Sequence, residues 1–140
     1  MVGVIVVTHC NLGRELIAAA ELVVGEELKQ FQSVSIDPKE SFEQIREKII
    51  EAIRKVDGGQ GILILTDMYG GTPSNISLSF LEEKKIDVIT GVNLPMLLKL
   101  ATYQNDMDLE QLALYITDYG QRNINLASEV LKKRLDKKKS

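Results

Sequence analysis

The strongest constraint on the fold is a regular alternation of short apolar runs with stretches of helical spacing. Four runs are rich in β-branched residues and have the length of strands; they cover residues 2–7, 31–36, 62–65 and 86–92. Segments with apolar residues three and four apart separate them. Strands that alternate with helices predict an α/β fold, a doubly wound and mostly parallel sheet with helices on both faces. The second run alternates only weakly, which is typical of an edge strand.

Cap and breaker residues predict where the later helices begin and end. Thr72 as N-cap, with Pro73 at the first helical position, predicts a helix that runs to about Lys85. Gly120 is expected to end a helix that begins near Leu109. These boundaries put two polar loops directly after buried strands.

The C-terminal part of the chain leaves two interpretations open. Residues 123–127 fit a short strand followed by a helix from Ser128, and they fit one continuous helix equally well. The basic run over residues 132–140 predicts a solvated helix end and a frayed tail.

Length and charge restrict the class of protein. The 140 residues suit a single domain, 1–140, and a net charge of −3 argues against nucleic acid as the main partner. The apolar runs are too short for a membrane span, and the first run lacks the basic leader of a signal peptide. A single cysteine, Cys10, excludes an internal disulfide and predicts a reducing, cytoplasmic location.

Three polar loops should gather at one edge of this sheet, because the carboxyl ends of parallel strands form the ligand-binding edge. The loops are 8–12, 66–75 and 91–95, and the first contains the only histidine, His9. If Asp67 accepts a hydrogen bond from Nδ1–H of this ring, the tautomer is fixed and Nε2 keeps a free lone pair. The sequence therefore predicts an oriented nucleophile that needs no metal.

A candidate anion site follows in the same loop as Asp67. Gly70 and Gly71 allow backbone N–H groups to turn inward, and the helix start after them favours negative charge. The Thr72 hydroxyl adds a donor unless the helix cap uses it. An imidazole among such donors suits a phosphoryl group, and we expect an apolar partner-facing rim around it, formed by side chains such as Leu12, Met68, Tyr69 and Leu94.

Each of these residues also has a purely structural interpretation. A histidine at a strand end is commonly a hydrogen-bonded structural residue, and an aspartate after a strand commonly caps a turn. The glycines can serve a helix-entry turn, and Cys10 is interpreted as a small packing residue. The chain lacks the glycine-rich motifs of nucleotide sites, the aromatic walls of a flavin site and the ligands of a metal site, so no cofactor and no metal are expected.

The sequence resembles the IIA domain of the mannose-type (mannose/fructose/sorbose) bacterial sugar phosphotransferase system. Two elements carry most of the resemblance, Asp-x-x-Gly-Gly-Thr-Pro-x-Asn and Gly-Val-Asn-Leu-Pro-Met-Leu. The matching stretches keep the family's order and spacing; they are residues 6–9, 19–26, 63–75 and 91–97.

This resemblance implies a phosphotransferase that carries a phosphoryl group on His9, at Nε2, with Asp67 as the orienting partner. The group would come from the histidine phosphocarrier protein and leave to a separate IIB component, which serves sugar uptake through membrane subunits. The family fold implies strand order 2-1-3-4 plus an antiparallel C-terminal edge strand, exchanged between the two subunits of a homodimer. Residues 124–127 are the candidate for that strand.

Two alternatives remain beside the transport role. A regulatory module would be phosphorylated on the same histidine without passing the group on, and a dihydroxyacetone-kinase-type phosphocarrier shares the fold but lacks the 70–75 stretch. Family members commonly have a small residue such as glycine where this chain has Cys10, which is expected to narrow the pocket slightly. The identity of the sugar does not follow from a IIA domain.

Overall fold

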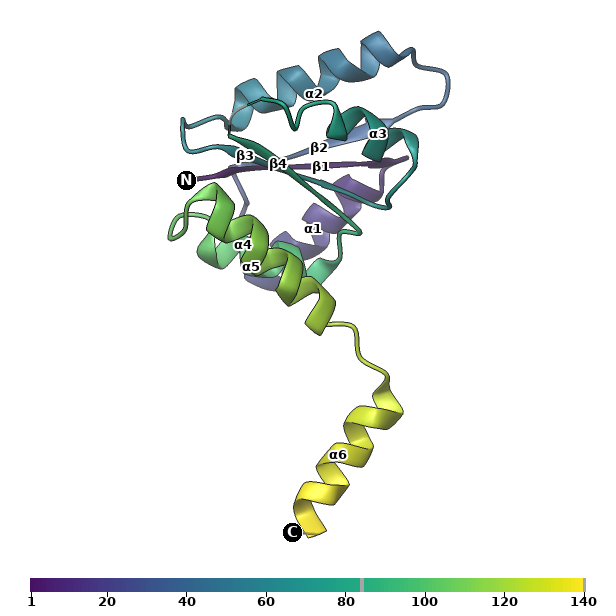
Figure 1. Ribbon diagram of the computed structural model, residues 1–140, viewed down its shortest axis with the longest axis vertical. Coiled ribbons are helices and arrows are strands. Elements are labelled where there is room, and N and C mark those ends of the chain that lie inside the picture. Colours follow the sequence, from purple (N-terminus) through teal and green to yellow (C-terminus); the bar gives the residue numbers. More distant parts are fainter. Residues whose placement is uncertain (84, 140) are drawn as a thin grey trace.

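The computed structural model describes residues 1–83 and 85–139 and shows the α/β fold that the alternating pattern predicts (Figure 1). All strand pairs are parallel, and the order is β2-β1-β3-β4, which confirms the predicted 2-1-3-4. The strands are β1 (Gly3–His9), β2 (Phe31–Ile36), β3 (Ile62–Thr66) and β4 (Ile86–Thr90). The predicted edge position of the second strand is also confirmed.

Helices cover both faces of the sheet, as expected for a doubly wound fold (Figure 1). One face is covered by α2 (Phe42–Val56) and α3 (Thr72–Leu78). The other is covered by α1 (Leu12–Val24), α4 (Leu94–Tyr103) and α5 (Leu109–Arg122). The last helix, α6 (Ala127–Lys139), stands away from this layered body.

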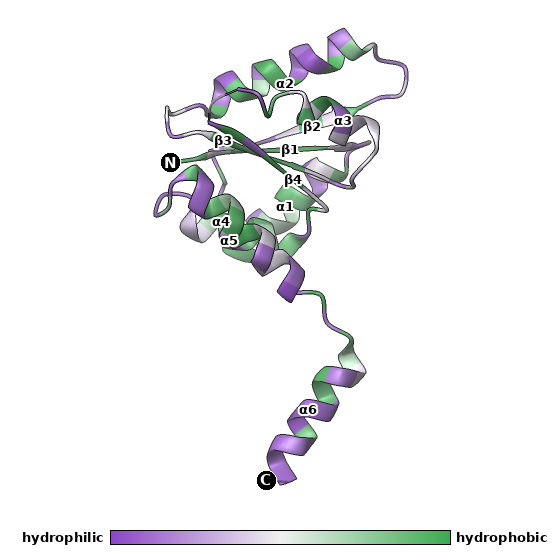
Figure 2. Ribbon diagram, viewed as in Figure 1, coloured by the Kyte–Doolittle hydropathy of each residue, from purple (hydrophilic) through white to green (hydrophobic). Residues whose placement is uncertain are grey.

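The central strand β1 is buried on both faces and divides the apolar core into two halves. Val4 and Val6 point into the half beneath α1, α4 and α5, whereas Ile5 and Val7 point into the half beneath α2 and α3. This division follows from the two-residue period of a strand. Figure 2 shows the same arrangement as apolar colour along the strands and on the sheet-facing sides of the helices.

The helix after β3 differs from its prediction at both ends. Gly71 is the N-cap and Thr72 is already the first helical residue. The helix ends at Leu78 rather than near Lys85, because the following backbone N–H groups bond to carbonyls three residues back, beginning with Ser79 to Ile76. These turns bring Phe80, only 1% exposed, into the core.

The prediction that Gly120 ends its helix is wrong, since α5 continues to Arg122. A Cβ atom at Gly120 would lie 2.6 Å from Sδ of Met96 on α4. This glycine therefore allows α4 and α5 to approach closely, and tertiary packing rather than helix termination explains it.

The antiparallel C-terminal strand is absent from the described residues of this single chain. Residues 124–126 have irregular backbone, with Ile124 and Leu126 largely exposed, and α6 begins at Ala127. One continuous helix is also wrong, because α5 ends at Arg122. A strand needs a hydrogen-bonded neighbour, and this segment has none within its own body.

None of the helices, over the described residues 1–83 and 85–139, combines the length and apolarity needed to cross a membrane.

Candidate functional site

His9 lies at the carboxyl end of β1, where two local features turn the chain. Cys10 has a left-handed backbone with φ of +51°. The buried Thr8 hydroxyl accepts a 2.8 Å hydrogen bond from the N–H of Gly13, so α1 begins directly after the turn. These features leave the His9 side chain at the surface, 48% exposed.

Asp67 binds His9 twice. Its Oδ2 atom lies 2.8 Å from Nδ1 of the ring and 3.1 Å from the backbone nitrogen of the same residue, whose N–H it accepts. Oδ1 accepts the N–H of Met68 at 3.1 Å. The Asp67 side chain, at 12% exposure, is more deeply buried than the ring and supports it from the protein side.

This contact determines which ring nitrogen is available. An ionised carboxylate can only accept, so Nδ1 carries the proton in the contact with Asp67. In the neutral ring Nε2 then has the lone pair, as the sequence interpretation requires. The arrangement is that of an oriented imidazole nucleophile.

Gly71 also lies against the ring. A Cβ atom at this position would be 2.8 Å from Cε1 and 3.2 Å from Nε2 of His9. The adjacent Gly70 has φ of +89°, in the left-handed region that favours glycine. The two glycines therefore serve different needs, close approach to the ring at one and backbone geometry at the other.

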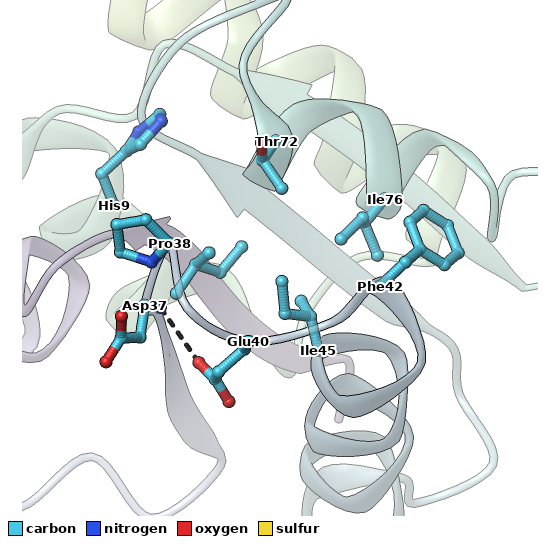
Figure 3. Close-up of a pocket in the computed structure, with 9 residues that line it drawn as sticks. His9, Asp37, Pro38, Glu40, Phe42, Ile45, Thr72 and Ile76 are labelled. Atoms are coloured by element: carbon cyan, nitrogen blue, oxygen red, sulfur yellow. Dashed lines mark hydrogen bonds between the residues drawn. The ribbon is translucent and has the colours of Figure 1, made fainter.

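Thr72 faces a pocket beside the histidine. No side chain caps the first turn of α3, so the Thr72 hydroxyl is not used as the helix cap. The pocket has a volume of about 270 Å³, and Figure 3 shows His9 and Thr72 among the residues that line it. Its remaining walls are mostly apolar; they are Ile36, Asp37, Pro38, Glu40, Phe42, Ile45 and Ile76.

The segment between β2 and α2 was missed as part of the site. Oε1 of Glu40 accepts the backbone N–H of Asp37 at 3.0 Å, drawn as a dashed line in Figure 3, and Lys48 at 3.0 Å. The Asp37 hydrogen bond, then Lys48, lowers the pKa of Glu40. The strand order contains the signal that could have found this wall, since β2 pairs with β1 and His9 lies opposite Ile36.

The third predicted loop, residues 91–95, makes structural hydrogen bonds. The carbonyl of Thr66 accepts the N–H groups of Gly91 and Val92, both at 2.9 Å, which ties this loop to the end of β3. Asn93 caps α4 through the N–H of Met96 and donates to the carbonyl of Gly120. None of these residues lines the pocket beside His9.

Cys10 is exposed, so its interpretation as a packing residue is wrong. It does not line the pocket between His9 and Ile76 either, and therefore does not narrow it. Within residues 1–83 and 85–139, no three histidine, cysteine or acidic side chains gather as metal ligands would.

Three of the four side chains expected to form an apolar rim are exposed to solvent. Leu12, Met68 and Tyr69 are 47%, 53% and 74% exposed, and Leu94 is half-buried. The site loops contain no lysine or arginine. Exposed apolar side chains in the loops that contain His9 and Asp67 suit contact with another protein.

A model of the EIIA-man family, described as "PTS system fructose IIA component", matches residues 3–116. The chain belongs to this family. It is 34% identical to the sorbose-specific EIIA component of Lacticaseibacillus casei over 81% of each chain. It is 29% identical to the fructose-specific EIIA component of Bacillus subtilis, over 95% of this chain and 91% of that one.

Solved structures agree with the family assignment. The phosphotransferase system component EIIA from Streptococcus agalactiae superimposes with a TM-score of 0.80 and 26% identity, over 92% of this chain and 99% of that one. The protein is therefore a IIA component, a phosphoryl carrier of mannose-family sugar uptake in the phosphotransferase system.

Proposed function

We propose that His9 is the residue that carries the phosphoryl group, at Nε2. The observation that supports this most is the 2.8 Å contact between Nδ1 and Asp67, made by a ring that is half exposed. Asp67 holds the proton on Nδ1, which leaves the Nε2 lone pair free for a partner protein.

The IIA family implies a histidine phosphocarrier protein as donor and a IIB component as acceptor. In the first transfer, Nε2 of His9 attacks phosphorus in line, the new N–P bond forms and the N–P bond to the donor imidazole breaks. The donor ring keeps the released electron pair. In the second transfer the same exchange runs from His9 to an imidazole of IIB. Both steps replace one N–P bond by another, so no other reactant is needed.

Gly70, Gly71 and Thr72 are proposed to hold the phosphoryl oxygens. A Cβ atom at Gly71 would lie 2.8 Å from Cε1 of the His9 ring, which is too close for a side chain, and the first turn of α3 has no side-chain cap. Backbone N–H groups and the Thr72 hydroxyl are then available as donors. Loops 8–12 and 66–75 contain no lysine or arginine, so these donors would bind the group without the charge pairing that would retain it.

Two further aspects of the proposal rest on the family. We place the protein in the cytoplasm, as one IIA domain over residues 1–140. We also propose a homodimer in which residues 124–127 add an antiparallel strand to β4 of the second subunit. The outer edge of β4 is unpaired in the sheet, and Ile124 and Leu126 are 78% and 68% exposed, which supports this pairing.

Phosphoryl labelling tests the role of His9. Incubation with labelled phosphoenolpyruvate, enzyme I and the phosphocarrier protein should label the chain with a stoichiometry near one, in an alkali-stable and acid-labile form. The label should be absent in His9→Ala and present in the matched variant Cys10→Ala, one residue further along. A persistent label in His9→Ala would exclude the proposal.

Release of the group distinguishes the transport role from a purely regulatory one. The labelled protein should lose its label when a IIB component of the mannose family is added. The matches to sorbose- and fructose-specific components favour this outcome over a regulatory or dihydroxyacetone-kinase-type carrier. A label that every such IIB leaves in place would favour regulation.

A further inference from the structure

The C-terminal helix α6 has no role in the site or in the core. It follows the irregular residues 124–126, none of its 13 residues is buried, and Figure 1 shows it projecting from the body. A helix of this length is marginal by itself in water, so its stability normally comes from a surface against which it packs. A stable α6 therefore needs a surface outside the body of this chain.

Charge separates α6 sharply from the rest of the molecule. Of the 17 basic and 20 acidic residues in the chain, the helix holds six basic and two acidic ones, a net charge of +4. The other residues therefore hold eleven basic and eighteen acidic side chains, a net charge of −7. An anionic surface would attract α6 and repel the body. The helix, and not the body, would therefore contact such a surface.

The apolar residues of α6 form a narrow stripe along the helix. Ala127, Leu131 and Leu135 follow one another at intervals of four, with Val130 three residues after Ala127, and the two leucines are 59% and 50% exposed. Arg134 and Lys138 lie on the same side by their spacing. Their aliphatic stems can lie along an apolar layer while the charged ends reach outward, as in helices that lie in a lipid headgroup region.

The composition of α6 favours lipid over protein as the surface. Protein interfaces are enriched in aromatic residues and methionine and depleted in lysine. The helix contains five lysines and no aromatic residue or methionine. Its apolar stripe is short, so attraction between its six basic side chains and anionic headgroups, about 1 kcal/mol for each one near the surface, would supply most of the binding free energy.

We propose that α6 binds reversibly to the surface of anionic membranes and keeps this phosphoryl carrier close to the bilayer. The inference does not depend on which residue carries the phosphoryl group. Binding would raise the local concentration of the carrier near the membrane subunits that sugar uptake requires, without insertion of the body.

Sedimentation with vesicles tests the proposal. The full chain should sediment with phosphatidylcholine vesicles that contain about one-third phosphatidylglycerol, and about tenfold less with phosphatidylcholine alone. Raising NaCl from about 50 mM to about 500 mM should abolish binding, because the screening length falls severalfold. Equal binding to both kinds of vesicle, or no binding to either at low salt, would overturn the proposal.

Matched variants locate the binding surface. Lys132→Glu with Lys133→Glu on α6 should lower the bound fraction about tenfold, whereas Lys29→Glu with Lys55→Glu, the same change of net charge on the body, should lower it far less. Equal losses in both variants would contradict a role for α6. If the α6 variant changed only the oligomeric mass, the surface would be a second copy and the proposal would be wrong.

A fluorescent reporter adds a readout at a single site, because the chain has no tryptophan. Leu131→Trp should show a blue-shifted emission on anionic vesicles. Leu114→Trp, at an exposed position of α5, should not shift. His9→Ala should bind vesicles like the unmodified chain, so failure of lipid binding and failure of phosphorylation remain distinguishable. An unshifted emission from Leu131→Trp would contradict the predicted apolar contact.

Discussion

At the scale of single residues, Asp67 and Gly71 constrain the His9 ring at different atoms. Asp67 fixes the proton on Nδ1, while Gly71 leaves room for the ring edge that contains Nε2. The first constraint is electrostatic and the second is steric. The two substitutions should therefore impair phosphoryl transfer in different ways.

Asp67→Asn should leave the fold intact and slow phosphorylation of His9 roughly 10- to 100-fold. An amide oxygen is a weaker acceptor than a carboxylate, and the amide nitrogen can donate to Nδ1 and so favour the wrong tautomer. Quenched-flow labelling by the phosphocarrier protein measures the rate. Asp118→Asn, an exposed position paired with Arg122, is the control and should be unaffected. An unchanged rate in Asp67→Asn would refute the orienting role.

Gly71→Ala should displace the His9 ring, because the added methyl group would lie 2.8 Å from Cε1. We expect phosphorylation to slow by roughly 10- to 100-fold, the usual effect of misplacing a reacting group by about 1 Å. The NMR shift of the Cε1 proton should move in the same variant. Gly58→Ala, where the nearest atom would be 3.7 Å away, should change neither observable. A normal rate together with a normal shift would show that the close approach is unimportant.

At the scale of secondary-structure elements, the site depends on side-chain contacts that hold neighbouring elements together. The turn before α2 is held by Glu40, whose carboxylate accepts from Asp37 and Lys48. The pair α4–α5 is held by the contact of Gly120 with Met96 and by the Asn93 side chain. Neither set of contacts could be predicted from the local sequence.

Glu40→Gln should lower thermal stability at neutral pH but not in acid. The pKa of Glu40 is lowered in the folded state, chiefly by the Asp37 N–H, so its stabilising effect is present above the ordinary value of 4.5 and is lost as pH falls through the lowered pKa. The melting temperatures of the two proteins should therefore differ at pH 7 and converge in acid below the lowered pKa. Glu43→Gln, in the first turn of α2, is the control. A difference independent of pH would contradict this account.

Gly120→Ala should destabilise the protein although alanine is the better helix former. Overpacking against Met96 should cost about 1–3 kcal/mol, whereas alanine gains only about 1 kcal/mol over glycine in a helix. Urea unfolding measures the difference. In a double-mutant cycle with Met96→Ala, the two effects should sum to more than the loss in the double variant. Additive effects would mean that the two residues do not clash.

At the scale of the whole molecule, the sheet could be predicted from the sequence and the C-terminal segment could not. Runs such as residues 62–65 are buried on both faces of the sheet, so a continuous apolar run identifies them as strand from the local sequence alone. Gly120 and Phe80 depend on distant contacts, which local rules do not include. The pairing of His9 with Asp67 followed from the strand ends, but the β2–α2 wall required the strand order.

The oligomeric state of the whole molecule determines whether the exposed residues 124–126 pair with a sheet edge. If they pair with a second subunit, light scattering should give twice the chain mass of 15.6 kDa. Ile124→Asp with Leu126→Asp should yield the monomer, because both exposed side chains would be buried by the pairing. Leu114→Asp, equally apolar and exposed on α5, should remain dimeric. A monomeric unmodified chain would exclude strand exchange.

The hydrogen bond from Nδ1 to Asp67 does not involve the ring nitrogen that is proposed to carry the phosphoryl group. A phosphoryl group on Nε2 leaves Nδ1–H and its acceptor in place, so the loaded and empty carriers need not differ in ring position. Loading and unloading then require little reorganisation of the protein. On the proposed assignment, the His9 site would therefore serve transfer in either direction without a change of ring position.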